Sequence, residues 1–283
     1  FRSGGLVYQP RIGGHKHVAE IDFVSLYPAI MVHFNISPET ILPDPDAENI
    51  VPALGLSIDT SQDGLIPKAL RPLLEKRVEM KKHLASTPHW DPYRKDFQRR
   101  SSALKWLLVT CFGYLGYKNA RFGRIEAHQA VTAYGREALL CAKEAAEDLG
   151  YRVIQLYVDG LWVQHPDKTH PEDIEPLLLE IQERTGLPIS LDGIYRWVVF
   201  VGSRQNKKRP VANRYFGVFQ DGSIKMRGID ARRRDSTPFV ADAQRHLLAL
   251  LASKTEPEDA LPEAVTYLRQ RLRALRAGQV KLP

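Results

Sequence analysis

Two acidic residues, far apart in the sequence, stand at the ends of apolar segments where a free carboxylate is costly. Asp22 lies near the end of the segment 18–24, and Tyr27 and Pro28 then open a predicted helix. Asp159 follows an apolar segment and sits in an Asp-Gly pair, which is typical of a tight hairpin turn. A carboxylate on a buried strand is unfavourable unless it is paired or binds a cation. We therefore expect a cation at Asp22, and Mg²⁺ is a suitable ion because it prefers oxygen ligands; Asp159 is the second candidate ligand.

The simpler interpretation of Asp159 is a turn residue without a role in chemistry. A set of cations between the two acids in the sequence favours the metal-site interpretation. Arg77 and Lys81 are four residues apart and therefore share one face of a predicted helix. Lys105 lies on the next predicted helix, which returns antiparallel to the first. Three cations on two such helices can clamp a triphosphate.

The charge of the chain is uneven, which indicates a polyanionic partner. The 283 residues carry 40 Lys and Arg against 33 Asp and Glu, a net charge of +7. Residues 66–125 contain 14 basic and 4 acidic side chains, and residues 203–234 contain 10 and 2, so the remainder is net acidic. Two basic tracts favour nucleic-acid binding, although two solvated faces would give the same pattern.

Composition excludes several other classes of protein. An apolar content of 43% is enough for a substantial core, and no apolar run reaches the length of a membrane span. The two cysteines, Cys111 and Cys141, favour a reduced, cytoplasmic protein, associated with the nucleoid if it binds DNA. Neither phosphate-loop nor dinucleotide-binding glycine motifs occur. No signal peptide is visible. Because the sequence begins with Phe1 and ends abruptly at Pro283, we expect a piece of a longer protein.

The apolar pattern predicts the elements that must position these side chains. Helices are expected over residues 68–83, 93–109, 126–148, 171–185 and 238–275, the last with a break near 257–262. Strands are expected over residues 152–158, 161–164, 196–201, 214–219 and 223–227, and a Gly13-Gly14 turn before the strand of Asp22.

Four segments together resemble family B DNA polymerases, in the order in which that family carries them. Asp-x-x-Ser-Leu-Tyr-Pro at residues 22–28 is similar to the first polymerase motif, and residues 105–114 are similar to the second, a Lys followed by Asn-Ser-x-Tyr-Gly. Tyr157-Val158-Asp159 resembles the Tyr-x-Asp-Thr-Asp hairpin of the family. Residues 207–219 resemble a basic strand that contacts DNA near the primer end.

This resemblance implies an α+β fold, in which helices pack on the antiparallel sheet of a polymerase palm and a two-helix fingers hairpin is inserted. It implies palm segments at residues 1–66 and 113–237, fingers at 67–112, and a truncated helical start of the thumb at 238–283. An exonuclease domain, if one exists, would precede Phe1.

The resemblance also implies partners and site residues. Asp22 and Asp159 would be catalytic and would bind two Mg²⁺ ions, and Tyr27 would exclude ribonucleotides as a steric gate. The residues implied to bind the incoming dNTP are Tyr27, Arg77, Lys81 and Lys105. The residues implied to contact primer–template DNA are Lys207, Lys208, Arg209, Arg214 and Tyr215. A sliding clamp is an expected partner through regions outside this fragment, and no membrane is expected.

One departure from the family pattern bears on activity. Leu161 stands two residues after Asp159, where the family motif has its second acid. Leucine cannot bind Mg²⁺, so the sequence predicts weak or lost polymerisation, with Mn²⁺ as a metal that could tolerate the altered site. Val109 and Asn213 also replace an Asn and a Lys of the family. The alternative function is an inactive polymerase fold that serves as a DNA-binding or scaffolding module.

Overall fold

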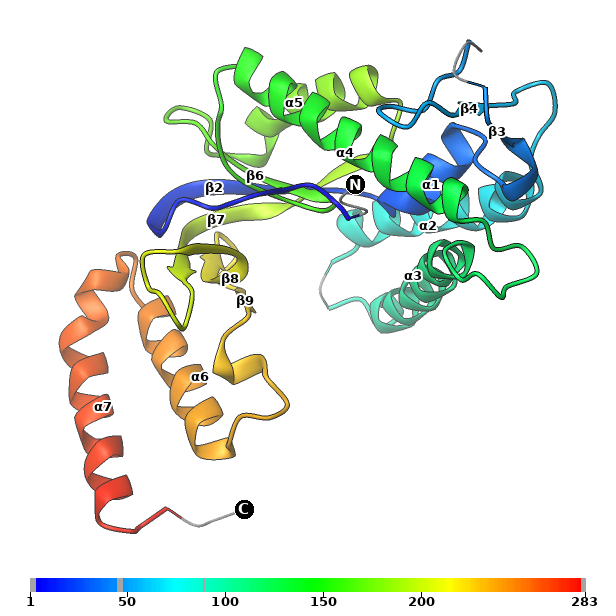
Figure 1. Ribbon diagram of the computed structural model, residues 1–283. Coiled ribbons are helices and arrows are strands. Elements are labelled where there is room, and N and C mark those ends of the chain that lie inside the picture. Colours follow the sequence, from blue (N-terminus) through cyan, green and yellow to red (C-terminus); the bar gives the residue numbers. More distant parts are fainter. Residues whose placement is uncertain (1–3, 45–47, 89, 281–283) are drawn as a thin grey trace.

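A curled antiparallel sheet forms the centre of the molecule, which is a computed structural model describing residues 4–44, 48–88 and 90–280 (Figure 1). Within these residues the sheet has seven strands in the order β1-β5-β6-β2-β7-β8-β9. Its strands are β1 (Val7–Tyr8), β2 (Gly13–Phe23), β5 (Arg152–Tyr157), β6 (Gly160–Gln164), β7 (Ile189–Gly202), β8 (Pro210–Phe219) and β9 (Ile224–Arg227). A separate short pair is formed by β3 (Ile41–Leu42) and β4 (Ser57–Ile58). The long strands β2 and β7 pair along most of their length and carry the site described below.

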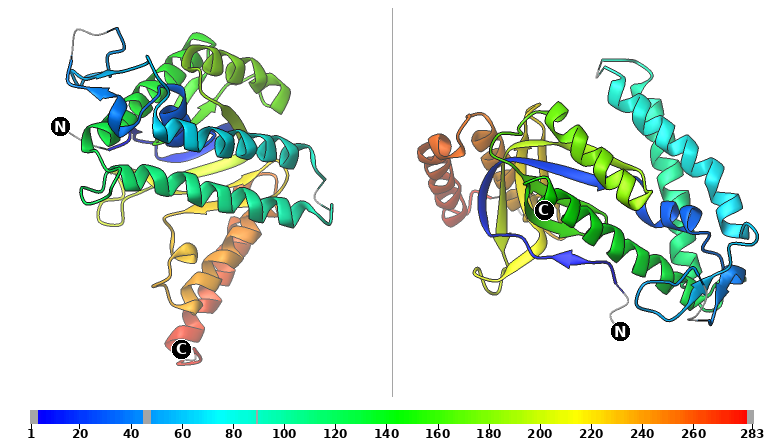
Figure 2. Two further views of the ribbon diagram at one scale, coloured as in Figure 1. Left: turned by 90° about the vertical axis from the view of Figure 1, so that its right-hand side faces the viewer. Right: turned by 90° about the horizontal axis from the view of Figure 1, so that it is seen from above.

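Helices cover one face of the sheet and extend from both of its ends. The helices are α1 (Leu26–His33), α2 (Leu65–Ser86), α3 (Arg94–Leu115), α4 (Ile125–Asp148), α5 (Pro171–Thr185), α6 (Pro238–Ala252) and α7 (Leu261–Arg276). Helices α4 and α5 lie over the sheet, α2 and α3 run side by side at one end, and α6 and α7 extend from the opposite side (Figures 1 and 2).

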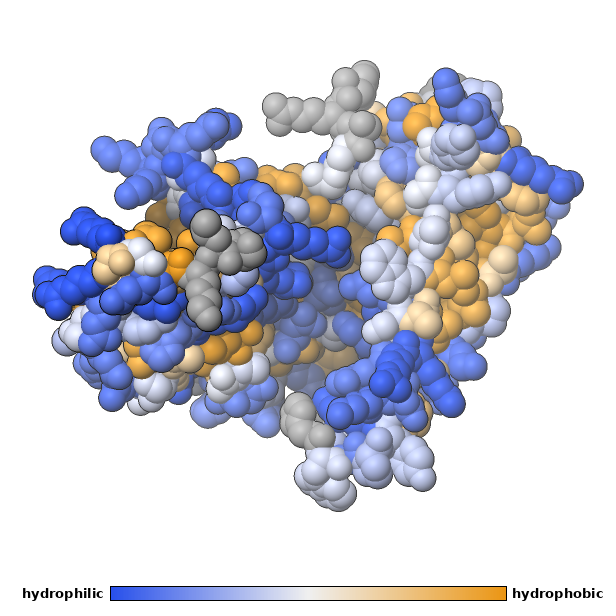
Figure 3. Space-filling model, turned by 90° about the horizontal axis from the view of Figure 1, so that it is seen from below, coloured by the Kyte–Doolittle hydropathy of each residue, from blue (hydrophilic) through white to orange (hydrophobic). Residues whose placement is uncertain are grey.

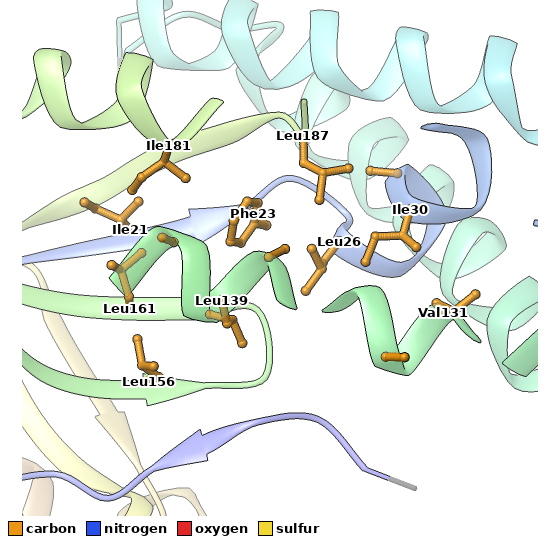
Figure 4. Packing of buried hydrophobic residues seen from close by; sticks show 14 of the residues in the cluster. Ile21, Phe23, Leu26, Ile30, Val131, Leu139, Leu156, Leu161, Ile181 and Leu187 are labelled. Atoms are coloured by element: carbon orange, nitrogen blue, oxygen red, sulfur yellow. The ribbon is translucent and has the colours of Figure 1, made fainter. Parts of the chain in front are cut away.

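The main core lies between the sheet and helices α1, α4 and α5. Alternation along β2 buries Ile21 and Phe23 on this face, where they are 0% and 1% exposed. Figure 4 shows Ile21 and Leu161 from neighbouring strands beside Leu139 of α4. The opposite face of β2 is therefore the one that presents Asp22.

Most of the expected elements are confirmed. Helix α5 spans Pro171–Thr185 as predicted, because Pro171 begins the helix and Gly186, at φ 66°, ends it. The predicted turn at Gly13-Gly14 is wrong, since both glycines lie within β2 and pair with β7. Strand β7 begins at Ile189, seven residues before its predicted start. The early part was missed because it contains Ser190, Asp192 and Gly193, which do not alternate like a half-buried strand.

The mixed architecture and the antiparallel sheet agree with the α+β expectation. The division into palm, fingers and thumb segments remains a prediction. Among the described residues, none of the helices combines the length and the apolar character needed to span a membrane.

Candidate active site

Backbone pairing places the two predicted acids side by side. Asp22 on β2 lies opposite Gly160 on β6, the residue that follows Asp159. The N–H of Phe23 donates a hydrogen bond of 2.9 Å to the main-chain carbonyl of Asp159. The end of one strand and the hairpin of its neighbour are thus joined directly, and both carboxylates line one pocket.

The β5–β6 turn is shifted by one residue from the predicted turn. Tyr157 pairs with Gly160, so the two turn residues are Val158 and Asp159 rather than Asp159 and Gly160. Val158 has φ 58°, a left-handed conformation that is rare for a β-branched residue. Its N–H donates a 3.0 Å hydrogen bond to the carbonyl of Leu6. A strained residue held in this way at a pocket fixes the position of the acid beside it.

The pocket has a volume of about 260 Å³ and brings together acids, cations and an aromatic ring. It lies where β2, β7 and the β5–β6 turn meet helices α1, α2 and α3. Its charged and aromatic lining residues are Asp22, Tyr27, Arg77, Lys81, Lys105, Phe112, Asp159 and Asp192. All six residues predicted to bind the nucleotide or the metal ions therefore line one pocket.

The two predicted carboxylates are held in an environment that resists their ionisation. Burial, followed by the negative charges of Asp159 and Asp192, raises the pKa of Asp22 to about 8. Burial also raises the pKa of Asp159, although Lys105 opposes this shift. A bound cation would favour the charged form of both carboxylates.

The donor set fits Mg²⁺ only in part. Asp22 and Asp159 provide the hard oxygen ligands that this ion prefers. No cluster of three or more His, Cys, Asp or Glu side chains suitable for a metal occurs among the described residues. A pair of carboxylates would therefore need the phosphate oxygens of a nucleotide to complete the coordination shells.

Asp192 is a pocket residue that the sequence did not reveal. Glu20 pairs with Gly193 and Ile21 with Leu191, so Asp192 is the extra residue of a β-bulge in β7. A bulge turns a side chain away from its regular direction and is frequent next to active sites. The signal that could have identified it is the Asp-Gly pair inside an otherwise apolar strand.

The three predicted phosphate-binding cations differ in their freedom to bind a ligand. Arg77 is 6% exposed, and it donates hydrogen bonds to the Ser25 hydroxyl at 2.8 Å and the Ser101 carbonyl at 2.6 Å. Much of its guanidinium therefore joins α2 to α1 and α3. The ammonium of Lys81 donates to the Ser190 hydroxyl at 3.2 Å. Lys105 also lines the pocket, where its positive charge opposes the rise in the pKa of Asp22 and of Asp159.

Tyr27 forms the floor of the pocket together with α3. Its ring lies 4.2 Å from the Phe112 ring, measured between centroids, and Phe112 in turn stacks on His128. A Cβ atom added to Gly135 would lie 3.0 Å from the Tyr27 ring, so the glycine leaves the ring its space. The Tyr27 ring is thus fixed from two sides.

Leu161 does not lie in the pocket. Its side chain is 0% exposed and belongs to the core, beside Ile21 and Leu139 (Figure 4). Because it pairs with Ile21 and not with Asp22, an acid at this position would point into the core. Asp159 lines the pocket and Leu161 packs in the core, and the replacement of a metal-binding acid by Leu161 stays a prediction.

The predicted DNA contacts are only partly at the surface. Lys207, Lys208 and Arg209 are exposed in the loop between β7 and β8. Arg214 is half-buried, and its guanidinium donates to the carbonyl of Gly202 at the base of that loop. Tyr215 is 3% exposed and packs in a second core cluster, so its prediction as a DNA contact is wrong.

The surface of the molecule is hollowed between two groups of helices. Figure 3 shows the hollow between the part formed by α6 and α7 and the part formed by α2 and α3, with hydrophilic side chains on the α6–α7 side.

Comparisons with known proteins agree with this geometry. The model of DNA polymerase family B matches residues 2–170. The chain is 32% identical over 285 residues to DNA polymerase 2 of Aeropyrum pernix and 30% identical over 279 residues to a DNA polymerase of Archaeoglobus fulgidus. Each match covers 99% of this chain but 34% of the relative, so the chain spans about a third of these proteins.

A solved structure is similar along nearly the whole chain. The family B DNA polymerase of Pyrobaculum calidifontis superposes with a TM-score of 0.70 at 29% identity, covering 98% of this chain and 35% of that one. The α+β fold with its curled antiparallel sheet is therefore shared with a polymerase structure.

Proposed function

Because this chain belongs to DNA polymerase family B, we propose that it is the catalytic core of a DNA polymerase, which transfers a nucleotide from a dNTP to the 3′-hydroxyl of a primer. The observation that carries the proposal is the joint presence of Asp22, Asp159, Lys105 and Tyr27 in one pocket. Acids for metal ions, cations for phosphate and a ring for the sugar are the parts that such a transfer needs.

Asp22 and Asp159 are the proposed metal ligands. Bound Mg²⁺ would stabilise charge on the attacking 3′-oxygen and on the leaving pyrophosphate. The strand pairing that joins Phe23 to Asp159 keeps the two carboxylates in register before any ligand arrives. Mn²⁺ is the alternative ion, because it accepts similar oxygen ligands.

Lys81 and Lys105 are the proposed contacts for the triphosphate, and Arg77 supports them from its buried position between the helices. Placing cations on the phosphate oxygens orients the nucleotide and offsets its charge. Tyr27 would pack against the sugar, where a 2′-hydroxyl would collide with the ring.

Primer–template DNA is the proposed macromolecular partner. The exposed cations Lys207, Lys208 and Arg209 can contact phosphates without reading sequence. They lie in the loop between β7 and β8, and β7 also carries the pocket residue Asp192. A palm formed by the sheet and fingers formed by α2 and α3 are the proposed domain names for these parts.

The position of Leu161 changes the expected level of activity. Since Asp159 faces the pocket together with Asp22, the pair of acids is complete without an acid at position 161. An active polymerase is therefore favoured over an inactive DNA-binding fold.

Primer extension by the full-length protein tests this function. We expect extension in Mg²⁺ that is abolished by Asp22→Ala. Unchanged DNA binding without any extension, in Mg²⁺ or Mn²⁺, would instead support the inactive DNA-binding module.

A further inference from the structure

A second acid of β2, Glu20, is buried close to the pocket without lining it. Glu20 is 5% exposed. One carboxylate oxygen accepts a 2.6 Å hydrogen bond from the hydroxyl of Tyr195, and the other lies 2.8 Å from the ammonium of Lys225. A buried carboxylate with these two partners is a rigid anchor, because removing either would leave one of its buried oxygens without a partner.

Lys225 reaches this anchor from the last strand of the sheet. It pairs with Gly217 on β8, and the curl of the sheet turns β8 and β9 back toward β2 (Figure 1). A side chain at Gly217 would not fit, because an added Cβ would lie 2.8 Å from Tyr195 Cδ1 and from the Trp197 carbonyl. The Lys225 ammonium lies 5.9 Å from the centre of the Phe219 ring. The lysine therefore extends over β8 instead of into solvent.

The same ammonium also contacts the reaction pocket. It lies 3.3 Å from Oδ2 of Asp192, the bulge residue that lines the pocket with Asp22 and Asp159. The three groups differ in exposure: the side chains of Glu20, Lys225 and Asp192 are 6%, 21% and 34% exposed. Lys225 thus connects the buried carboxylate of Glu20 to the more exposed carboxylate of Asp192, which lines the pocket.

We propose that Lys225 is a positioning residue of the polymerase pocket: anchored on Glu20, it fixes the Asp192 carboxylate and balances its charge beside Asp22 and Asp159. This inference rests on the proposed function. Without Lys225, Asp192 would add an unbalanced negative charge next to the metal ligands and would lose its fixed direction.

The effects on metal binding and on catalysis should have opposite signs. In the full-length protein, Lys225→Met should bind Mn²⁺ roughly threefold or more tightly, measured by electron paramagnetic resonance of the free ion, because a nearby positive charge is gone. Its kcat for primer extension should fall about tenfold, as expected when a residue that orients a site is lost. Lys225→Arg should keep both values near those of the unchanged protein.

Two further variants separate positioning from folding. Lys225→Met leaves the buried Glu20 carboxylate without its counter-charge, so the double variant Glu20→Gln/Lys225→Met serves as a neutral replacement that should fold and show the same two effects. In an Asp192→Asn background, adding Lys225→Met should change kcat and Mn²⁺ affinity less than twofold. Lys254→Met, at an exposed lysine, is the matched control and should change neither.

Three results would overturn the proposal. One is a Lys225→Met protein with a lower melting temperature but unchanged Mn²⁺ affinity and kcat, which indicates a structural ion pair. Another is full additivity of the Lys225 and Asp192 effects. The third is weaker Mn²⁺ binding in Lys225→Met. If the unchanged protein fails to extend primers, the proposed function fails, while the Mn²⁺ titrations still test the positioning role.

Discussion

The N–H of Phe23 donates a 2.9 Å hydrogen bond to the carbonyl of Asp159, and this contact sets the geometry of the whole pocket. It places the residue after Asp22 against the turn that carries the second acid. The closeness of the two acids therefore comes from strand pairing, and it does not depend on a chance side-chain conformation. The following expectations depend on this arrangement.

Removal of the Lys105 ammonium from the pocket should lower the efficiency with which dNTP is incorporated. Lys105→Ala should lower kcat/KM for dNTP about ten- to a hundredfold, because the ammonium that balances the triphosphate charge is lost. Single-turnover primer extension measures this effect. Lys76→Ala, on an exposed part of α2 outside the pocket, is the control, and an equal loss in both variants would argue against a specific role for Lys105.

Removal of the Tyr27 ring should weaken the selection of deoxyribonucleotides over ribonucleotides. Tyr27→Ala should incorporate ribonucleotides far more readily relative to dNTPs than the unchanged protein does, since the ring no longer blocks a 2′-hydroxyl. Competition between rNTP and dNTP in primer extension gives the ratio. Tyr134→Ala removes a ring that stacks on Phe34 outside the pocket and should leave the ratio unchanged.

Stability should depend on the protonation of His128. Its ring stacks at 4.3 Å on Phe112, and its buried Nδ1 has no hydrogen-bond partner among the described residues. Burial lowers the pKa of His128 from its ordinary value of 6.5. The unfolded chain therefore binds this proton more readily than the folded one, so this contribution to stability is complete above about pH 6.5 and is lost as the pH falls below it.

Urea unfolding at about pH 7 and about pH 5 checks the pH effect. The loss of stability between these values should be smaller in His128→Gln than in the unchanged protein. The same loss in both would mean that other groups cause it.

Substitutions in two neighbouring parts of residues 207–219 should have different effects. Tyr215→Ala should lower the free energy of unfolding by about 3–5 kcal/mol, because it removes a ring from the second core cluster. Lys207→Ala/Lys208→Ala should leave stability unchanged but weaken DNA binding and reduce its dependence on salt. Salt titrations of DNA affinity and urea unfolding separate the two. A large loss of stability in the lysine variant would contradict the assignment.

The sequence was sufficient to predict the helices and to identify the acidic residues that stand at the ends of apolar segments. Asp22 and Asp159 stand out because carboxylates are rare beside buried strands, and α5 carries its own start and stop residues. Their meeting in one pocket follows from the resemblance to a known family, which placed the motifs in order.

What the sequence could not give is the register between strands that are far apart in the chain. Motif spacing did not show that Leu161 pairs with Ile21 and that its side chain packs in the core. Asp192 and Lys225 were missed because a bulge and a curled sheet bring them together. Tyr215 was assigned to DNA because its neighbours are basic, although its ring is buried.

The most direct test compares two variants of the catalytic hairpin in Mg²⁺-dependent primer extension by the full-length protein. Asp159→Asn should abolish extension while leaving the fold intact, because it removes a carboxylate from the pocket. Leu161→Asp should bring no gain in activity and should destabilise the protein, because it buries a charge in the core. Persistent extension by Asp159→Asn, or a strong gain of activity in a folded Leu161→Asp protein, would contradict the assignment of Asp159 as the partner of Asp22.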